Sequence, residues 1–300
     1  DCDGEPGELT DDPFEAIGLN CPGGTETNSI QVDNAVFNAN DATSWAIITG
    51  FGSAAGNHYN GRLWAANTDD WESPEGESVP PNTSTAMLML TTGTIATPSV
   101  DAVVIEAAES QPFNGTNGNE DSGGLPLPLS AEMGSNAGAG GTPFMGCDGE
   151  NDCSDSLFDH WFTQGWDNPN DKVWMSFDVV VPQGTHGYVF DFAFFSSEWP
   201  DWVDDEFNDL FIAWQVSEAY TGNATFVNDA PLTITSMHYA DGFAYTGDAP
   251  ELAGTGHETH ASTGWYTARG ALVPGETAQL TFFLADMGDD QYGSNLLLDN

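Results

Sequence analysis

The sequence predicts an all-β fold, namely an antiparallel β-sandwich of jelly-roll type with long irregular loops. Short runs of apolar and aromatic residues recur along the chain, and each ends at Gly, Pro, Asn or Asp. No long segment has the helical period of 3.6 residues. Strands that follow one another without helices between them pack as antiparallel sheets, so a sandwich is the expected architecture.

The first 28 residues predict an irregular arm rich in Gly, Pro and Asp. Its apolar stretch, residues 12–19, predicts a helical turn that begins at Asp11 or Asp12, with Pro13 at the first helical position. Residues 29–300 are expected to form a single β-sandwich domain.

Strand-like runs follow the arm, and their alternation predicts which side chains share a face. Phe190, Phe192 and Phe194 are expected on one face of a strand. On the next strand, Leu210, Ile212, Trp214 and Val216 are expected to share a face. The predicted strands cover residues 44–52, 85–93, 100–108, 172–181, 187–195, 209–217, 231–239, 278–286 and 295–299.

Two intervals have no strand pattern, residues 54–84 and a longer loop insertion near 107–160. Loops of this length usually carry function or cover a surface.

The charge is extremely one-sided. Against 47 Asp and Glu there are 3 Lys and Arg, and the formal net charge is -44. Such a surface repels phosphate backbones and anionic lipids, so we expect no nucleic-acid partner, and we expect cations to bind. No apolar run reaches the roughly 18 to 20 residues of a membrane span, so no direct membrane insertion is expected. Adaptation to high salt is an alternative explanation of the acidity.

The four cysteines form two local pairs, Cys2 with Cys21 and Cys147 with Cys153. An even count in a Gly- and Asn-rich chain favours disulfides and an oxidising compartment. A zinc site is the weaker alternative, since neither pair has the short CxxC spacing. The chain begins at Asp1 without an initiator Met, which is typical of a mature secreted protein.

Three acidic motifs lie at strand ends: Ser197-Glu198-Trp199-Pro200, Phe207-Asn208-Asp209, and Ala285-Asp286 followed by Gly288-Asp289. With residues 90–300 around them, they resemble the choice-of-anchor L domain, a bacterial family of exported, surface-directed proteins. The opening residues 12–24 resemble leaders of myxobacterial members. The resemblance implies an extracellular, cell-surface location, but it does not define a biochemical role. Trp199 replaces the usual Glu-Tyr pair, so one carboxylate of the family pattern is missing.

The residues around these motifs are typical of a Ca²⁺ site, because calcium takes six to eight oxygen ligands. If the strands that follow the two acidic loops pair, four carboxylates could converge on one ion. The alternative is that these loops are solvated acidic turns. The candidate ligands are Glu198, Asp209, Asp286, Asp289, Asn208 and Asp290. A possible second site comprises Asp148, Glu150, Asp152 and Asp155.

Catalytic motifs are weak, so we expect no enzyme. A carboxylate pair suited to glycoside hydrolysis arises by chance among 47 acids. The tetrad from His257 to His260 is not HExxH, and we expect it in a surface loop.

We therefore expect a secreted, calcium-stabilised surface protein that self-associates as a homo-oligomer, filament or surface layer, or acts in adhesion. Calcium would allow such acidic subunits to approach one another. The alternative is a lectin-like module that binds a surface glycan through Trp199 and Trp202, which flank the acidic loop.

Overall fold

A computed structural model gives the structure of the protein. It describes residues 10–20, 30–53, 59–60, 86–111, 116–121, 123–130, 152–153, 157, 169–227 and 230–299. Cys2, Cys21 and Cys147 lie outside these ranges, and only the backbone of Cys153 is described, so the disulfides remain predictions.

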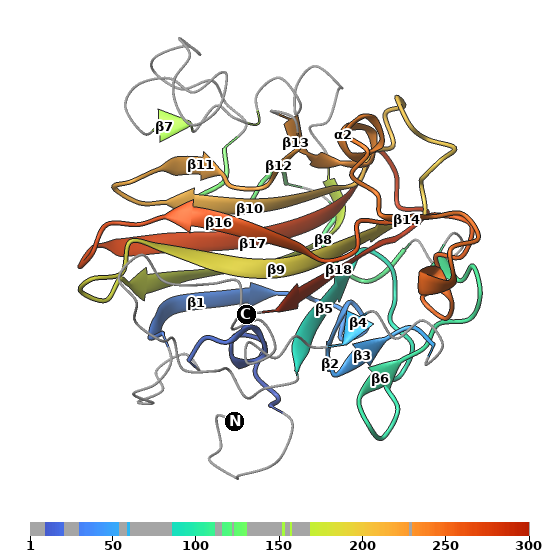
Figure 1. Ribbon diagram of the computed structural model, residues 1–300, viewed down its shortest axis with the longest axis horizontal. Coiled ribbons are helices and arrows are strands. Elements are labelled where there is room, and N and C mark those ends of the chain that lie inside the picture. Colours follow the sequence, from blue (N-terminus) through green and yellow to red (C-terminus); the bar gives the residue numbers. More distant parts are fainter. Residues whose placement is uncertain are drawn as a thin grey trace.

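Two antiparallel sheets pack face to face, which confirms the predicted β-sandwich (Figure 1). Sheet I has the order β1 (Val32–Asn38), β8 (Pro169–Val180), β17 (Thr277–Met287), β10 (Leu210–Val216), β11 (Thr221–Asn223) and β7 (Asp152–Cys153). Two further strands of this sheet are β13 (Ala230–Thr233), which pairs with β10, and β12 (Phe226–Val227), which pairs with β13.

Sheet II has the order β14 (Tyr245–Thr246), β15 (Ala261–Ser262), β9 (Gly187–Ser196), β18 (Ser294–Asp299), β5 (Met87–Thr91) and β2 (Trp45–Ile48). β16 (Tyr266–Ala271) also pairs with β9. A small third sheet contains β4 (Tyr59–Asn60), β3 (Gly50–Phe51) and β6 (Val103–Val104). The described helices are η1 (Glu15–Ile17), α2 (Ile234–Tyr239) and η5 (Pro250–Leu252).

Aromatic side chains fill the space between the two sheets. Phe192 of β9 lies 5.3 Å from Phe211 of β10, and Phe190 lies 4.9 Å from Phe282 of β17, measured between ring centroids. The other face of β10 is also buried, because Leu129 packs onto it. Burial on both faces explains why β10 is almost continuously apolar.

Several strand predictions need correction. Residues 231–239 contain β13 and then α2, because the Thr233 hydroxyl and Ser236 form a reciprocal cap that begins a helix. Within 100–108, only Val103 and Val104 form a strand. β1 and β16 were not predicted, since both are largely exposed and lack a clean apolar alternation.

The N-terminal arm contains a helical turn, but η1 covers Glu15–Ile17, so Pro13 precedes its first position instead of occupying it as predicted. Asp12 Oδ1 accepts hydrogen bonds from the backbone N–H groups of Phe14 and Glu15, and η1 begins at Glu15. An acidic side chain before a helical turn therefore has its usual capping role.

Two connections cross between the sheets at the same end of the sandwich. Residues 197–209 lead from β9 in sheet II to β10 in sheet I, and residues 288–293 lead from β17 in sheet I back to β18 in sheet II. β9, which precedes the first connection, pairs with β18, which follows the second. β17, which precedes the second connection, pairs with β10, which follows the first. The two loops therefore lie together.

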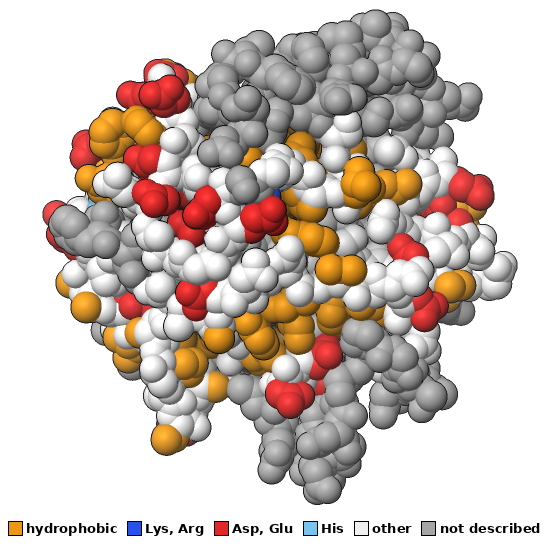
Figure 2. Space-filling model, turned by 180° about the vertical axis from the view of Figure 1, so that it is seen from behind, with side chains coloured by type: hydrophobic (Ala, Val, Ile, Leu, Met, Phe, Trp, Pro, Cys, Tyr) orange, Lys and Arg blue, Asp and Glu red, His pale blue; other side chains and the backbone are white. Residues whose placement is uncertain are grey.

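The surface carries the charge imbalance of the sequence. Figure 2 shows Asp and Glu side chains distributed over one face, with scarcely any Lys or Arg visible among them. In the described part of the chain, no helix is long and apolar enough to cross a membrane.

Candidate metal centre

The carboxylates of the two crossing loops converge, but the pairing that brings them together differs from the one expected. β10 and β18, the strands that follow the loops, belong to different sheets and do not pair. Instead, Leu210 of β10 lies opposite Ala285 of β17, and Ser196 of β9 lies opposite Ser294 of β18. These two pairings place Asp209 near Asp286, and they bring Glu198 in from the other sheet.

Glu198, Asp286 and Asp289 form the core of the site. Each presents one carboxylate oxygen, and these oxygens all lie within 4.8 Å of one another. Ligands on opposite sides of a calcium ion are about 4.6 to 5.2 Å apart, since each Ca–O distance is about 2.3 to 2.6 Å. The spacing therefore fits a single ion bound between the three side chains.

Asp209 completes the group and joins it to the backbone. Its Oδ1 accepts the N–H of Met287 at 3.1 Å, and its own N–H donates to Glu198 Oε2 at 3.0 Å. Glu198 and Asp209 therefore each use one oxygen to hold the loops together. The second oxygen of each remains available.

These side chains are buried without enough donors. Glu198 is 1% exposed, and Asp209 and Asp286 are fully buried. Four of their oxygens accept no hydrogen bond from the described residues: Glu198 Oε1, Asp209 Oδ2, and both carboxylate oxygens of Asp286. Because a buried unpaired charge is very costly, these oxygens require either a proton or a cation.

The pKa shifts have the same cause. Burial raises the pKa of Glu198 well above its usual value, and the Asp209 carboxylate raises it further. Burial raises the pKa of Asp209 to about 7, although the hydrogen bond from the Met287 N–H partly offsets this. The pKa of Asp286 is also raised well above its usual value, first by burial and then by the charges of Asp209 and Glu198.

No basic side chain of the described residues neutralises the group. The Lys172 ammonium pairs with Glu120 Oε2 at 3.5 Å and donates to the Gly124 carbonyl at 3.2 Å. Arg269 lies on β16, opposite Val189. The site presents oxygen ligands alone, a set that suits a hard divalent cation such as Ca²⁺ rather than zinc or copper.

Of the two remaining predicted ligands, Asp290 is not one of the three converging carboxylates, and Asn208 stays a prediction. The Asn208 side-chain oxygen accepts the N–H of Thr235 at 3.0 Å, so it holds the first turn of α2. Asp290 is half-buried, and its carbonyl accepts a hydrogen bond from the Thr116 hydroxyl at 3.2 Å. Its carboxylate is not among the three that converge.

The other predicted sites have mixed outcomes. Asp148, Glu150 and Asp155 lie outside the described residues, and of Asp152 only the backbone in β7 is described. The expectation of a surface loop at residues 257–260 is wrong for His257, which is fully buried with Nδ1 3.1 Å from Ser197 Oγ.

The two candidate glycan-binding tryptophans are half-buried and packed within the loops. Trp199 donates its indole N–H to His238 at 3.2 Å. The ring of Trp202 lies 5.1 Å from that of Phe207 and 6.0 Å from that of Tyr292. These contacts anchor both tryptophans and leave only part of each ring available to a ligand.

One buried carboxylate near this centre was not predicted. Asp171 is fully buried at the start of β8, and burial raises its pKa to about 7. Its only signal in the sequence is an acidic residue placed directly before a strongly apolar strand.

No protein-family model, curated protein or solved structure matches this chain in the three comparisons. The resemblance to the choice-of-anchor L domain therefore stays a prediction that depends on the three motifs.

Proposed function

We propose that this protein is a calcium-stabilised, non-enzymatic structural protein of the cell exterior. The observation that carries the proposal is the group of buried carboxylates Glu198, Asp209 and Asp286, which comes from both sheets and has no described basic partner. A Ca²⁺ ion at this point would replace electrostatic repulsion by shared coordination.

The burial of the group supports a structural role over a catalytic one. Glu198 is 1% exposed and Asp286 is fully buried, so a polysaccharide cannot reach the pair as a glycosidase requires. An ion bound here would instead connect β9 with β10 and β17, and so join the two sheets at one end. A ligand at 100 times its dissociation constant stabilises a native protein by about 2.7 kcal/mol.

The surface role depends on composition and on the family resemblance. With a net charge of -44, copies of this chain repel one another unless cations intervene. Extracellular calcium is commonly millimolar, a range that matches the affinity of about 10⁻⁴ to 10⁻³ M typical of extracellular calcium modules. We therefore propose calcium-dependent self-association in a filament or surface layer, or in adhesion.

Thermal unfolding with light scattering at fixed ionic strength tests the proposal. Calcium added to chelator-treated protein at about 100 times its dissociation constant is expected to raise the melting temperature by about 5 to 10 °C, from the linkage energy above and about 2 to 4 °C per kcal/mol. A concentration-dependent growth in scattering is expected with it. Magnesium, matched in ionic strength, separates calcium binding from general screening of charge.

The variant Asp286→Asn tests whether Asp286 is a calcium ligand or has only a structural role. Without calcium at pH 8 it is expected to melt higher than the wild type, because one of the crowded charges is gone. With calcium it is expected to lose most of the rise. The matched control is Asp201→Asn, an exposed carboxylate on the same loop, which should keep the full response. An equal calcium response in both variants would refute the metal centre.

A lectin-like function is the second candidate. The half-buried pair Trp202 and Tyr292, 6.0 Å apart, favours it because it lies on the loops that carry the metal ligands. A glycan array with and without chelator distinguishes the two functions, since the assembly proposal expects no selective sugar binding.

A further inference from the structure

We propose that a second divalent cation binds beside the first, between the start of β8 and residues 116–121, with Asp171, Asp121 and Asp290 as its carboxylate ligands. This inference rests on the proposed calcium chemistry, but it uses residues outside the converging group of Glu198, Asp286 and Asp289.

Asp171 is held in place by an irregularity of the sheet. Leu284 of β17 pairs with Val173, whereas Asp286 pairs with Asn170, so β8 has one extra residue at this point. Asp171 has a φ of 47°, in the left-handed region that non-glycine residues seldom adopt. Such bulges are common where a strand directs a side chain into a functional site.

The Asp171 side chain is fully buried and only half satisfied. Its Oδ1 accepts the backbone N–H of Asn117 at 3.0 Å, whereas Oδ2 has no hydrogen-bond partner among the described residues. An unpartnered carboxylate oxygen in a dry position requires a positive partner or a proton. The nearest lysine in the sequence, Lys172, pairs with Glu120 instead.

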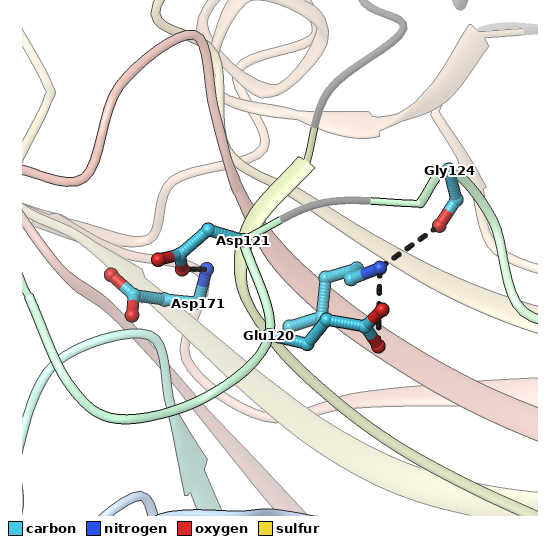
Figure 3. Close-up of polar contacts among 5 residues, drawn as sticks. Glu120, Asp121, Gly124 and Asp171 are labelled. Atoms are coloured by element: carbon cyan, nitrogen blue, oxygen red, sulfur yellow. Dashed lines mark hydrogen bonds and ion pairs between the residues drawn. The ribbon is translucent and has the colours of Figure 1, made fainter.

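The surroundings of Asp171 are acidic. Asp121 Oδ1 accepts the Asp171 N–H at 3.1 Å, which places the two residues together. Figure 3 shows their carboxylates on the same side, away from Glu120 and Gly124, which bind the lysine. Asp290 lies beside the same segment, since its carbonyl accepts a hydrogen bond from the Thr116 hydroxyl at 3.2 Å.

The exposure of these groups provides a route for the ion. Asp171 is buried, Asp290 is half-buried and Asp121 is exposed, so the carboxylates extend from the interior to solvent. Water would complete the six to eight oxygen ligands that Ca²⁺ requires. The carboxylate oxygens of these three residues do not all lie within 4.8 Å of one another, so binding would draw Asp121 and Asp290 toward the free Asp171 oxygen.

An ion at this position would fasten residues 116–121 across the end of the sandwich. The Thr116 hydroxyl already donates to the Asp290 carbonyl. The Asn117 side-chain amide donates to the carbonyls of Thr92 and Gly93 at 3.0 and 2.9 Å. The same segment therefore contacts both sheets, and the second ion would lie beside the loop that supplies Asp289 to the first.

Calcium binding to the chelator-treated full chain tests this inference, with the amount of bound ion measured by equilibrium dialysis and the affinities by calorimetry. Asp171→Asn is expected to bind one ion fewer than the wild type and to keep the ion that Asp286→Asn loses. Asp121→Asn is expected to weaken the second ion at least about 10-fold, since losing even an outer partner of a metal ligand typically costs about 10- to 100-fold in affinity. Asp201→Asn is the matched control and should bind as the wild type does.

Each outcome bears on one proposal or on both. If Asp286→Asn loses an ion while Asp171→Asn binds as many ions as the wild type with the same affinity, the second site is refuted and the first stands. If Asp171→Asn does not fold, Asp121→Asn decides, because its side chain is exposed; unchanged stoichiometry and affinity in that variant refute the second site. A wild-type chain that binds no calcium refutes both.

Discussion

The ends and the middle of the connection 197–209 have the same kind of side chain in opposite environments. Glu198 and Asp209, near its two ends, are buried and have oxygens without donors. Asp204, Asp205 and Glu206, in its middle, are exposed. There the Tyr239 hydroxyl donates to Asp204, and Asp205 accepts the N–H of Glu206 at 2.8 Å. A high density of acids is therefore not what distinguishes the proposed metal site; its carboxylates differ from the others of the loop by burial without donors.

The largest contrast is expected between Asp209→Ala and Asp205→Ala in calcium. Asp209→Ala leaves the buried N–H of Met287 without its acceptor, which costs about 1 to 3 kcal/mol, and it also weakens the ion. We expect a total loss of about 3 to 5 kcal/mol of unfolding free energy. Asp205→Ala is expected to stay within about 0.5 kcal/mol of the wild type. Denaturant unfolding measures both, and similar losses would remove the distinction between the two regions.

The next largest effect is expected from pH in the absence of calcium. A carboxyl whose pKa is higher in the folded than in the unfolded chain binds protons preferentially when folded. Its stabilisation is complete below the unfolded pKa of about 4. It is lost as the pH rises through the folded pKa, about 7 for Asp209. We expect chelator-treated protein to lose about 2 to 4 kcal/mol between pH 5 and pH 8.

Calcium should reverse this trend, because the ion competes with protons for the same oxygens. The calcium-induced rise in melting temperature is expected to be larger at pH 8 than at pH 5. In chelator-treated protein, Asp286→Asn should make the unfolding free energy depend less steeply on pH. Asp205→Asn changes the net charge equally and should leave that dependence steep. An identical slope in the two variants would assign the effect to overall charge repulsion.

A smaller effect is expected at Asn208, a predicted metal ligand whose side-chain oxygen accepts a hydrogen bond from the first turn of α2. Asn208→Ala removes the acceptor for the Thr235 N–H and is expected to cost about 1 kcal/mol, as other capping losses do. Its calcium affinity should equal that of the wild type in calorimetry. A marked fall in affinity would return Asn208 to the set of ligands.

The smallest effect is expected from the triple variant Asp204→Asn, Asp205→Asn, Glu206→Gln. It removes acidity from the middle of the loop, but it leaves the buried carboxylates in place. Stability in calcium should change by no more than about 0.5 kcal/mol in total. Calorimetry should give an unchanged calcium affinity, and a large decrease would mean that exposed charge attracts the ion.

The sequence was sufficient to predict the sandwich, because aromatic alternation such as Phe190, Phe192 and Phe194 persists in the core. It also identified the two loops whose acids converge. It did not reveal which acids are buried, since that depends on pairings between strands distant along the chain. The role of Asp171 depends on an extra residue in β8, and no local pattern of side chains marks such a bulge.

The crossing of the two connections has a consequence for chain topology. An ion shared by Glu198 and Asp286 would close a circuit of roughly 90 residues, much as a disulfide does, and such closure restricts the unfolded chain by about 4 to 5 kcal/mol in the entropic account. Unlike a disulfide, this link needs no oxidant and opens when calcium is scarce. On the proposed route to the cell exterior, the polypeptide would travel unlinked through the calcium-poor interior and become fastened only where it works.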